Sequence, residues 1–180
     1  MALDNMKTPR GRDAAVLYLD YDGVLSPADV WWHPRRGAYI NSPDGHNLFE
    51  NVPLLERALE PHPHVVIVLS TSWTRHLGHA RAARRLSPAL RRRVIGSTYH
   101  TSMDAEAFAA LPRWFQITQD AARRRVGDWL AVDDDCLGWP DWCNEKLVAT
   151  HEVNGISEPS VFEELKCKLT RFSSANVHGF

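Results

Sequence analysis

The sequence has little cysteine, no excess of charge of either sign and no long apolar run. Its three cysteines, Cys136, Cys143 and Cys167, are odd in number and lack CxxC spacing, which argues against a disulfide framework or a zinc site and fits a reducing compartment. No apolar stretch approaches the roughly 18 residues of a membrane span. The polar start, residues 1–13, has no signal-peptide core. We therefore expect a soluble cytoplasmic protein with no membrane contact.

The lack of net charge excludes a strong overall attraction to polyanions. The formal charge is -1, from 21 basic and 22 acidic residues, so any preference for nucleic acid must be local. Arginines cluster in residues 81–93 and 122–127. We interpret both clusters as solvated helix faces, because arginine is also a good helix former.

The positive features begin with alternating patterns along a chain of 180 residues, 44% of them hydrophobic. Short apolar runs alternate with helical patterns, which predicts a single α/β domain with helices around a mostly parallel five-stranded sheet. The expected strands span residues 16–19, 65–69, 93–96, 129–132 and 146–150. The expected helices span about 52–60, 74–86, 112–125 and 159–170. Residues 1–13 are expected to form a disordered tail and 14–180 the domain.

A small insertion at about 26–50 follows the first strand. It mixes Pro, Gly and Asn with aromatic and basic residues, which is typical of a loop or short hairpin, and a loop of this length is usually functional. Its notable side chains are Trp31, Trp32, Arg35, Arg36 and Tyr39. They could stack a base and bind a second phosphate, or they could pack the insertion onto the domain.

Carboxylates and hydroxyls follow three of the predicted strands. In an open parallel sheet, ligands bind beyond the carboxyl ends of the strands. The residues delivered there are Asp20 and Asp22, then Ser70, Thr71 and Ser72, and finally Asp133, Asp134 and Asp135. Crowded carboxylates repel one another, and a divalent cation offsets this. Oxygen ligands favour Mg²⁺, which commonly binds a substrate phosphate as well.

The spacing of the first pair allows two chemical roles. If the chain stays extended past the strand, Asp20 and Asp22 share a face. Gly23 then lets the chain turn away without a side chain in the path of a substrate. One carboxylate can attack phosphorus while the other donates and accepts a proton.

These motifs resemble those of the haloacid dehalogenase (HAD) superfamily, whose members are mostly Mg²⁺-dependent phosphatases and phosphotransferases. The first family signature stands here as "LYLDYDGVL", the second as "VVIVLSTSW" and the fourth as "WLAVDDD". They occur in the family's order, and the resemblance covers about residues 14–150. It implies a Rossmann-like, three-layer sandwich fold and hydrolysis of a phosphomonoester through an aspartyl phosphate.

The resemblance also implies a role for each matching residue. Asp20 would be the nucleophile, Asp22 the general acid and base, and Ser70 a hydrogen-bond donor to the phosphoryl group. Mg²⁺ would be held by Asp20, by the backbone carbonyl of Asp22, and by Asp133 or Asp134. Asp135 either reaches the metal or only caps the following loop.

The third signature, a lone basic residue, is the loosest. The candidates are Arg113, which opens the helix before the acidic strand, and the run 123–125 at its other end. We favour Arg113, because the run should lie near the opposite edge of the sheet.

Within the superfamily, "LSTSW" followed by Arg75 is similar to small stand-alone domains associated with nucleic-acid repair. Members of that group commonly have "SSSWR", whereas Thr74 separates Trp73 from Arg75 here, which weakens the transfer of a substrate. The expected partner is a phosphorylated small molecule or a nucleic-acid end. Candidate substrate contacts are Gly23, Thr71, Arg75, Trp31 and Arg35.

Two other function classes remain. A catalytically idle binding or regulatory module could keep the fold, although such modules usually lose part of the residue set. A glycosyltransferase could use the DxD pair for a metal and a nucleotide sugar, but Gly23 and the second hydroxyl-bearing strand argue against it. The last ten residues, 171–180, could be disordered or could dock on the domain.

Overall fold

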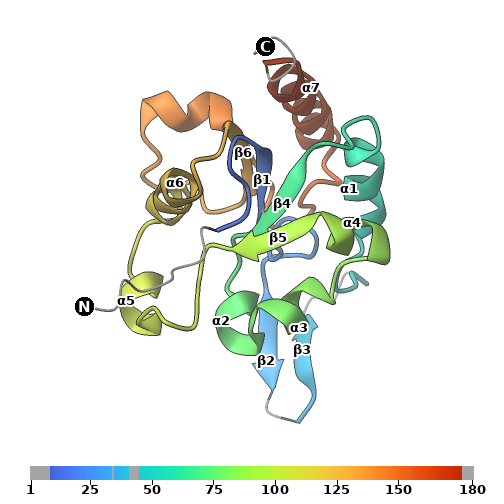
Figure 1. The fold of residues 1–180 in the computed structure, drawn as a ribbon. Helices are drawn as coiled ribbons and strands as arrows, with labels where there is room; N and C mark the ends of the chain where they lie inside the picture. The colour runs from blue at the N-terminus through green and yellow to red at the C-terminus, as the bar shows by residue number, and fades with distance from the viewer. Residues whose placement is uncertain (1–8, 34, 41–44, 176–180) are drawn as a thin grey trace, which may run out of the picture.

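The central sheet has the predicted architecture. A computed structural model describes residues 9–33, 35–40 and 45–175. Its five strands are β1 (Ala15–Leu19), β4 (Val66–Leu69), β5 (Val94–Ser97), β6 (Asp128–Asp133) and β7 (Leu147–Ala149). All pair in parallel, in the order β5-β4-β1-β6-β7 (Figure 1). The α/β Rossmann-like prediction is therefore confirmed, with β1 at the centre.

Helices cover both faces of this sheet because the strands are apolar on both sides. On β1, Leu17 and Leu19 face one core cluster, while Val16 and Tyr18 face the other. Residues of α1 (Val52–Leu59) and α7 (Pro159–Ala175) contribute to the first cluster. Residues of α6 (Arg113–Arg124) and the 3-10 helix η1 (Asp141–Lys146) contribute to the second. Figure 1 shows α6 and α7 on opposite sides of the strands.

The prediction of a single helix over residues 74–86 is wrong. The chain forms α2 (Trp73–Leu77) and α3 (His79–Ala83) instead. Gly78 separates them with a φ of +78°, a conformation that glycine adopts without strain and that breaks a helix. Two short helices were not predicted, α4 (Pro88–Arg93) and α5 (Ala105–Ala109). Both begin at a capping side chain, Ser87 and Asp104.

The insertion after β1 contains a hairpin of β2 (Val30–His33) and β3 (Gly37–Ile40), paired antiparallel. Alternation along the strands separates its aromatic residues. Trp31 and Tyr39 pair across the strands and are exposed, whereas Trp32 packs against the domain. In Figure 1 the hairpin projects beyond α2 and α3.

Both ends of the described chain contact the domain. At the start, the Arg10 carbonyl accepts a hydrogen bond from Arg124, and the Asp13 amide donates to the Arg125 carbonyl. The rest of the expected tail, residues 1–8, lies outside the described residues. At the other end α7 runs past its predicted limit to Ala175, and Phe172 is buried. Residues 176–180 lie outside the described part. Among the described helices, none has the length and apolar character needed to cross a bilayer.

Candidate active site

The first candidate side chain, Asp20, follows β1 at the centre of the sheet. Its amide donates to the Val132 carbonyl at 3.1 Å, which continues the ladder between β1 and β6. Its carboxylate is buried and accepts hydrogen bonds from the Tyr21 amide at 2.7 Å and from Arg113 Nη2 at 2.9 Å, among others. Asp20 is thus fixed in position by the backbone on one side and by α6 on the other.

The turn after this aspartate requires glycine at position 23. Gly23 has a φ of +67°, and a Cβ there would lie 2.3 Å from Asp134 Oδ2. Its carbonyl accepts a hydrogen bond from Thr150 Oγ1 at 2.7 Å. The turn therefore brings the end of β1 into close contact with the acidic segment that follows β6.

The second aspartate of the pair is held by a tryptophan. Trp73 Nε1 donates to Asp22 Oδ1 at 2.8 Å. The Trp73 side chain is fully buried, and its ring lies in edge contact with Phe49 and with Trp32 of the hairpin, at centroid distances of 5.0 and 4.7 Å. Burial raises the pKa of Asp22 to about 7, although the Trp73 hydrogen bond opposes this rise. Asp22 can therefore carry a proton near neutral pH.

The residue that follows β4, Ser70, has a buried hydroxyl without a hydrogen-bond partner in the described chain. Ser70 is inaccessible to solvent, and its amide donates to the Leu19 carbonyl at 2.8 Å. Its Oγ makes no hydrogen bond within the described residues. Buried hydroxyls are normally paired, so this one has the character of a ligand contact. Burial raises the pKa of Asp20, and a hydrogen bond from Thr71, which is also buried, opposes this rise.

Asp133 and Asp134, at the end of β6, complete a cluster of three carboxylates. Oxygen atoms of Asp20, Asp133 and Asp134 all lie within 4.8 Å of one another, close enough to hold one metal ion. Arg113 Nε lies 3.1 Å from Asp133 Oδ2, so this arginine pairs with both Asp20 and Asp133. Asp135 is outside the cluster. Its carboxylate accepts a hydrogen bond from the Leu137 amide at 3.3 Å. This contact corresponds to the second of the two roles considered for Asp135, that of capping the following loop.

The cluster is electrostatically unfavourable without a cation. Burial, reinforced by the charge of Asp20, raises the pKa of Asp133 well above its ordinary value and that of Asp134 to about 6. Burial alone would lower the pKa of Arg113, but Asp20 and Asp133 raise it, so it stays positively charged. One guanidinium faces three carboxylates. An all-oxygen donor set that needs more positive charge fits a hard divalent ion such as Mg²⁺.

The residues expected to contact substrate do not all lie at this cluster. In the described chain, no hydrogen bond or ion pair joins Arg75 or Arg35 to the carboxylates, and Trp31 is 57% exposed on the outer face of the hairpin. The run 123–125 is not at the cluster either. Arg124 is buried and pairs with Asp120 at 2.6 Å. Sequence reasoning missed the contact between Trp73 and Asp22, although Trp73 stands inside the second motif.

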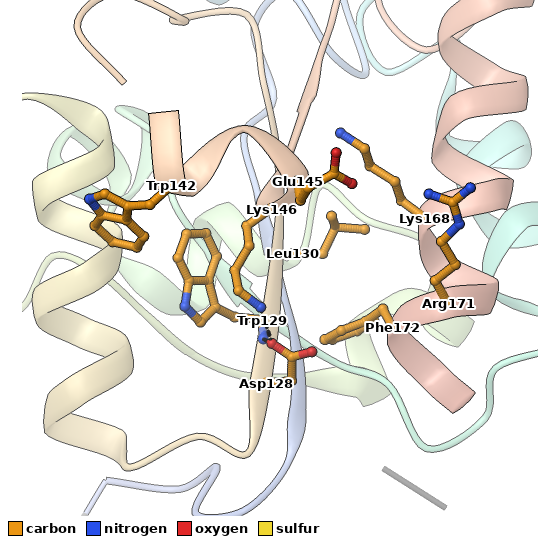
Figure 2. A pocket seen from close by; sticks show the side chains of 9 residues that line it. All are labelled: Asp128, Trp129, Leu130, Trp142, Glu145, Lys146, Lys168, Arg171 and Phe172. Atoms are coloured by element: carbon orange, nitrogen blue, oxygen red, sulfur yellow. Dashed lines mark hydrogen bonds and ion pairs between the residues drawn. The ribbon is translucent and has the colours of Figure 1, made fainter. Parts of the chain in front are cut away.

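A separate cavity lies beside the start of β6, at the end of the strand opposite the carboxylate cluster. It has a volume of about 230 Å³ and lies between β6, η1 and α7 (Figure 2). Asp128 and Trp129, at the start of β6, line it, whereas the carboxylate cluster follows the end of that strand. Lys146 is paired with Asp128 and lies over the Trp129 ring. This cavity is therefore not part of the carboxylate site.

Comparison with known families identifies the domain. Residues 16–161 match the model of a family described as the HAD domain in Swiss Army Knife RNA repair proteins. The chain belongs to this family. The match confirms the resemblance to the HAD superfamily and ties it to nucleic-acid repair. No curated protein and no solved structure shows significant similarity. Membership of the HAD family supports a phosphatase-type function for the cluster at the end of β1.

Proposed function

We propose that this HAD domain hydrolyses a phosphomonoester by transferring the phosphoryl group to Asp20. The proposal rests on the residues that surround the Asp20 carboxylate. Arg113 holds one of its oxygens, Asp133 and Asp134 complete an acidic cluster around it, and the unpaired Ser70 hydroxyl lies on the neighbouring strand.

The reaction proceeds in two balanced steps. In the first, an Asp20 oxygen forms a bond to phosphorus, the bond from phosphorus to the leaving oxygen breaks, and Asp22 gives that oxygen its proton. In the second, water attacks the phosphorus of the aspartyl phosphate, the bond between phosphorus and the Asp20 oxygen breaks, and Asp22 takes a proton from the attacking water. Inorganic phosphate leaves and both carboxylates return to their starting forms. The pKa of Asp22, raised to about 7 by burial, suits both proton transfers.

The remaining residues would bind the metal ion and the phosphoryl group and would orient Asp20. Asp20, Asp133 and Asp134, with the backbone carbonyl of Asp22, would hold Mg²⁺, which would offset negative charge on the phosphoryl group. Arg113 would keep Asp20 oriented for in-line attack. Ser70 would donate its free hydroxyl hydrogen to a phosphoryl oxygen.

For the substrate class, we favour a phosphate at the end of an RNA strand over a small phosphorylated metabolite. The family's description names RNA repair proteins. In addition, the insertion after β1 contains only the two-stranded hairpin of β2 and β3 in its described part, which leaves room for a long substrate. Nucleotides and sugar phosphates are the competing class.

The decisive test is a panel of phosphomonoesters with Mg²⁺ or EDTA. We expect Mg²⁺-dependent release of phosphate, fastest from oligonucleotide ends, and a loss of about 10³-fold or more in kcat for Asp20→Asn. Asp141→Asn, at an exposed position on η1, is the control and should keep wild-type activity. Full activity of Asp20→Asn would exclude this nucleophile. No turnover of any substrate by the wild type would favour a non-catalytic binding module.

A further inference from the structure

One segment of the chain is rich in arginine and free of acidic residues. Residues 61–103 contain no Asp or Glu, although the whole chain has 22 acidic and 21 basic residues. The arginines of this segment are Arg75, Arg81, Arg84, Arg85, Arg91, Arg92 and Arg93. The near-zero net charge therefore conceals an uneven distribution, with positive charge concentrated on α2, α3 and α4 around the edge strand β5 (Figure 1).

Some of these arginines have structural roles and others have none. The Arg93 guanidinium donates to backbone carbonyls between α1 and β4, and that of Arg85 lies 5.4 Å from the centroid of the Trp73 ring. In contrast, Arg84 and Arg91 are exposed, and neither guanidinium forms an ion pair or hydrogen bond with any described residue. Their charges are therefore available to a ligand.

Two hollows along β5 share one lining residue, His79, and together they are called the groove below. The first, of about 320 Å³, is also lined by Arg84 and Arg91 near the start of β5. The second, of about 370 Å³, is lined by Arg10 and His100 near the carboxyl end of the strand. No acidic side chain lines either hollow within the described chain. The arginines that line the groove, Arg10, Arg84 and Arg91, are therefore not offset by a carboxylate in its lining.

The groove reaches the candidate active site at its second end. Thr74 lines the groove there, and its hydroxyl donates to the Thr71 carbonyl at 2.8 Å. The amide of Thr98, which follows β5, donates to the carbonyl of Leu69, the residue before Ser70. The second hollow therefore lies beside the hydroxyl-bearing segment that follows β4.

We propose that this groove binds the phosphodiester backbone of the nucleic-acid strand whose terminal phosphate lies at Asp20, with Arg84 and Arg91 contacting phosphates distant from the reaction. The inference rests on the proposed function. Guanidinium groups pair with phosphate oxygens through two hydrogen bonds. A concave groove with unpaired arginines suits a chain of phosphates, whereas a lipid surface is flat and would engage protruding groups.

The test separates strand binding from catalysis. Binding of a fluorescent single-stranded RNA 20-mer with a 3′-hydroxyl is measured by anisotropy in EDTA, at several salt concentrations. We expect Arg84→Ala/Arg91→Ala to weaken binding about 10-fold and to reduce the slope of log K against log salt by about 1.4, since each phosphate contact on a single strand contributes about 0.7. Activity on p-nitrophenyl phosphate should be unchanged.

The matched control removes two positive charges at the opposite edge of the sheet. Lys166→Ala/Arg171→Ala alters α7, which packs against β6 and β7, and should bind RNA like the wild type. Equal weakening by both double variants would overturn the groove assignment, as would binding to phosphatidylserine vesicles but not to RNA. RNA binding that depends on Arg84 and Arg91, in a protein without phosphatase activity, would support the groove while rejecting the proposed function.

Discussion

At the scale of single residues, the contact between Trp73 and Asp22 has the most specific consequence. The indole N–H fixes one oxygen of the carboxyl group that is proposed to protonate the leaving group. A proton donor matters most for a poor leaving group and least for a good one. We expect Trp73→Phe to lower kcat/KM about 10-fold for an alkyl phosphate but by less than about 3-fold for 2,4-dinitrophenyl phosphate.

The constant kcat/KM is the appropriate measurement, because it covers only the steps up to loss of the leaving group. Trp73 is also part of the core, so a purely structural effect must be separated. Trp139→Phe removes another indole hydrogen bond, to the Asp135 carbonyl, and should show no dependence on the leaving group. An equal loss on both substrates in Trp73→Phe would mean that the residue does not position the acid.

At the scale of elements, the turn that joins β1 to the insertion sets the distance between two acidic segments. Gly23→Ala places a methyl group 2.3 Å from Asp134 Oδ2, in addition to the strain of a positive φ. We expect the variant to bind Mg²⁺ at least about 10-fold more weakly, an effect like that of removing a supporting group around a metal site. Isothermal titration calorimetry measures this affinity directly.

Gly138→Ala is the matched comparison for this turn. Gly138 has a φ of +70°, but apart from its own atoms and its two chain neighbours no atom of the described chain lies within 4 Å of the position that the new methyl group would take. It therefore suffers the same backbone strain, about 1–2 kcal/mol, without displacing Asp134. If both variants lose the same Mg²⁺ affinity, strain alone explains the effect and the close approach of Gly23 has no special role.

The strands were predictable because each is apolar on both faces and is followed by polar residues, so their positions and parallel arrangement could be expected from the sequence. The break at Gly78 was not, because the alanine- and arginine-rich sequence around it favours helix on both sides. Arg113 could be placed beside the carboxylates from the third family signature together with its position at a helix start. The contact of Trp73 with Asp22 could not, since it joins residues 51 apart through side-chain packing.

At the scale of the whole molecule, the buried acids make stability depend on pH. Burial raises the pKa of Asp22 from 3.8 to about 7. Folding favours the neutral form of Asp22. The resulting contribution of Asp22 to the free energy of unfolding is therefore fully present below about pH 4 and is lost as pH rises through about 7. In EDTA, we expect the free energy of unfolding of the wild type to fall more steeply across this range than that of Asp22→Asn.

Urea unfolding at several pH values measures this difference. Asp20, Asp133 and Asp134 act in the same direction and remain in both proteins, so only the difference between the two curves belongs to Asp22. Asp29→Asn, an exposed aspartate near the hairpin, should follow the wild-type curve. Parallel curves for the wild type and Asp22→Asn would show that Asp22 titrates alike in the folded and unfolded chain.

The order of the sheet has a consequence for how the domain can be divided. Asp20 and Asp133 stand beside each other only because β6 pairs with β1, and residues far apart along the chain supply the two strands. Ser70 likewise depends on the pairing of β4 with β1. A fragment that ends before residue 128 would contain the DxD pair, the hydroxyls and Arg113, but no acidic cluster. Synthesis of the chain through β6 is therefore a precondition for the cluster, and a nascent chain has no such cluster until β6 pairs with β1.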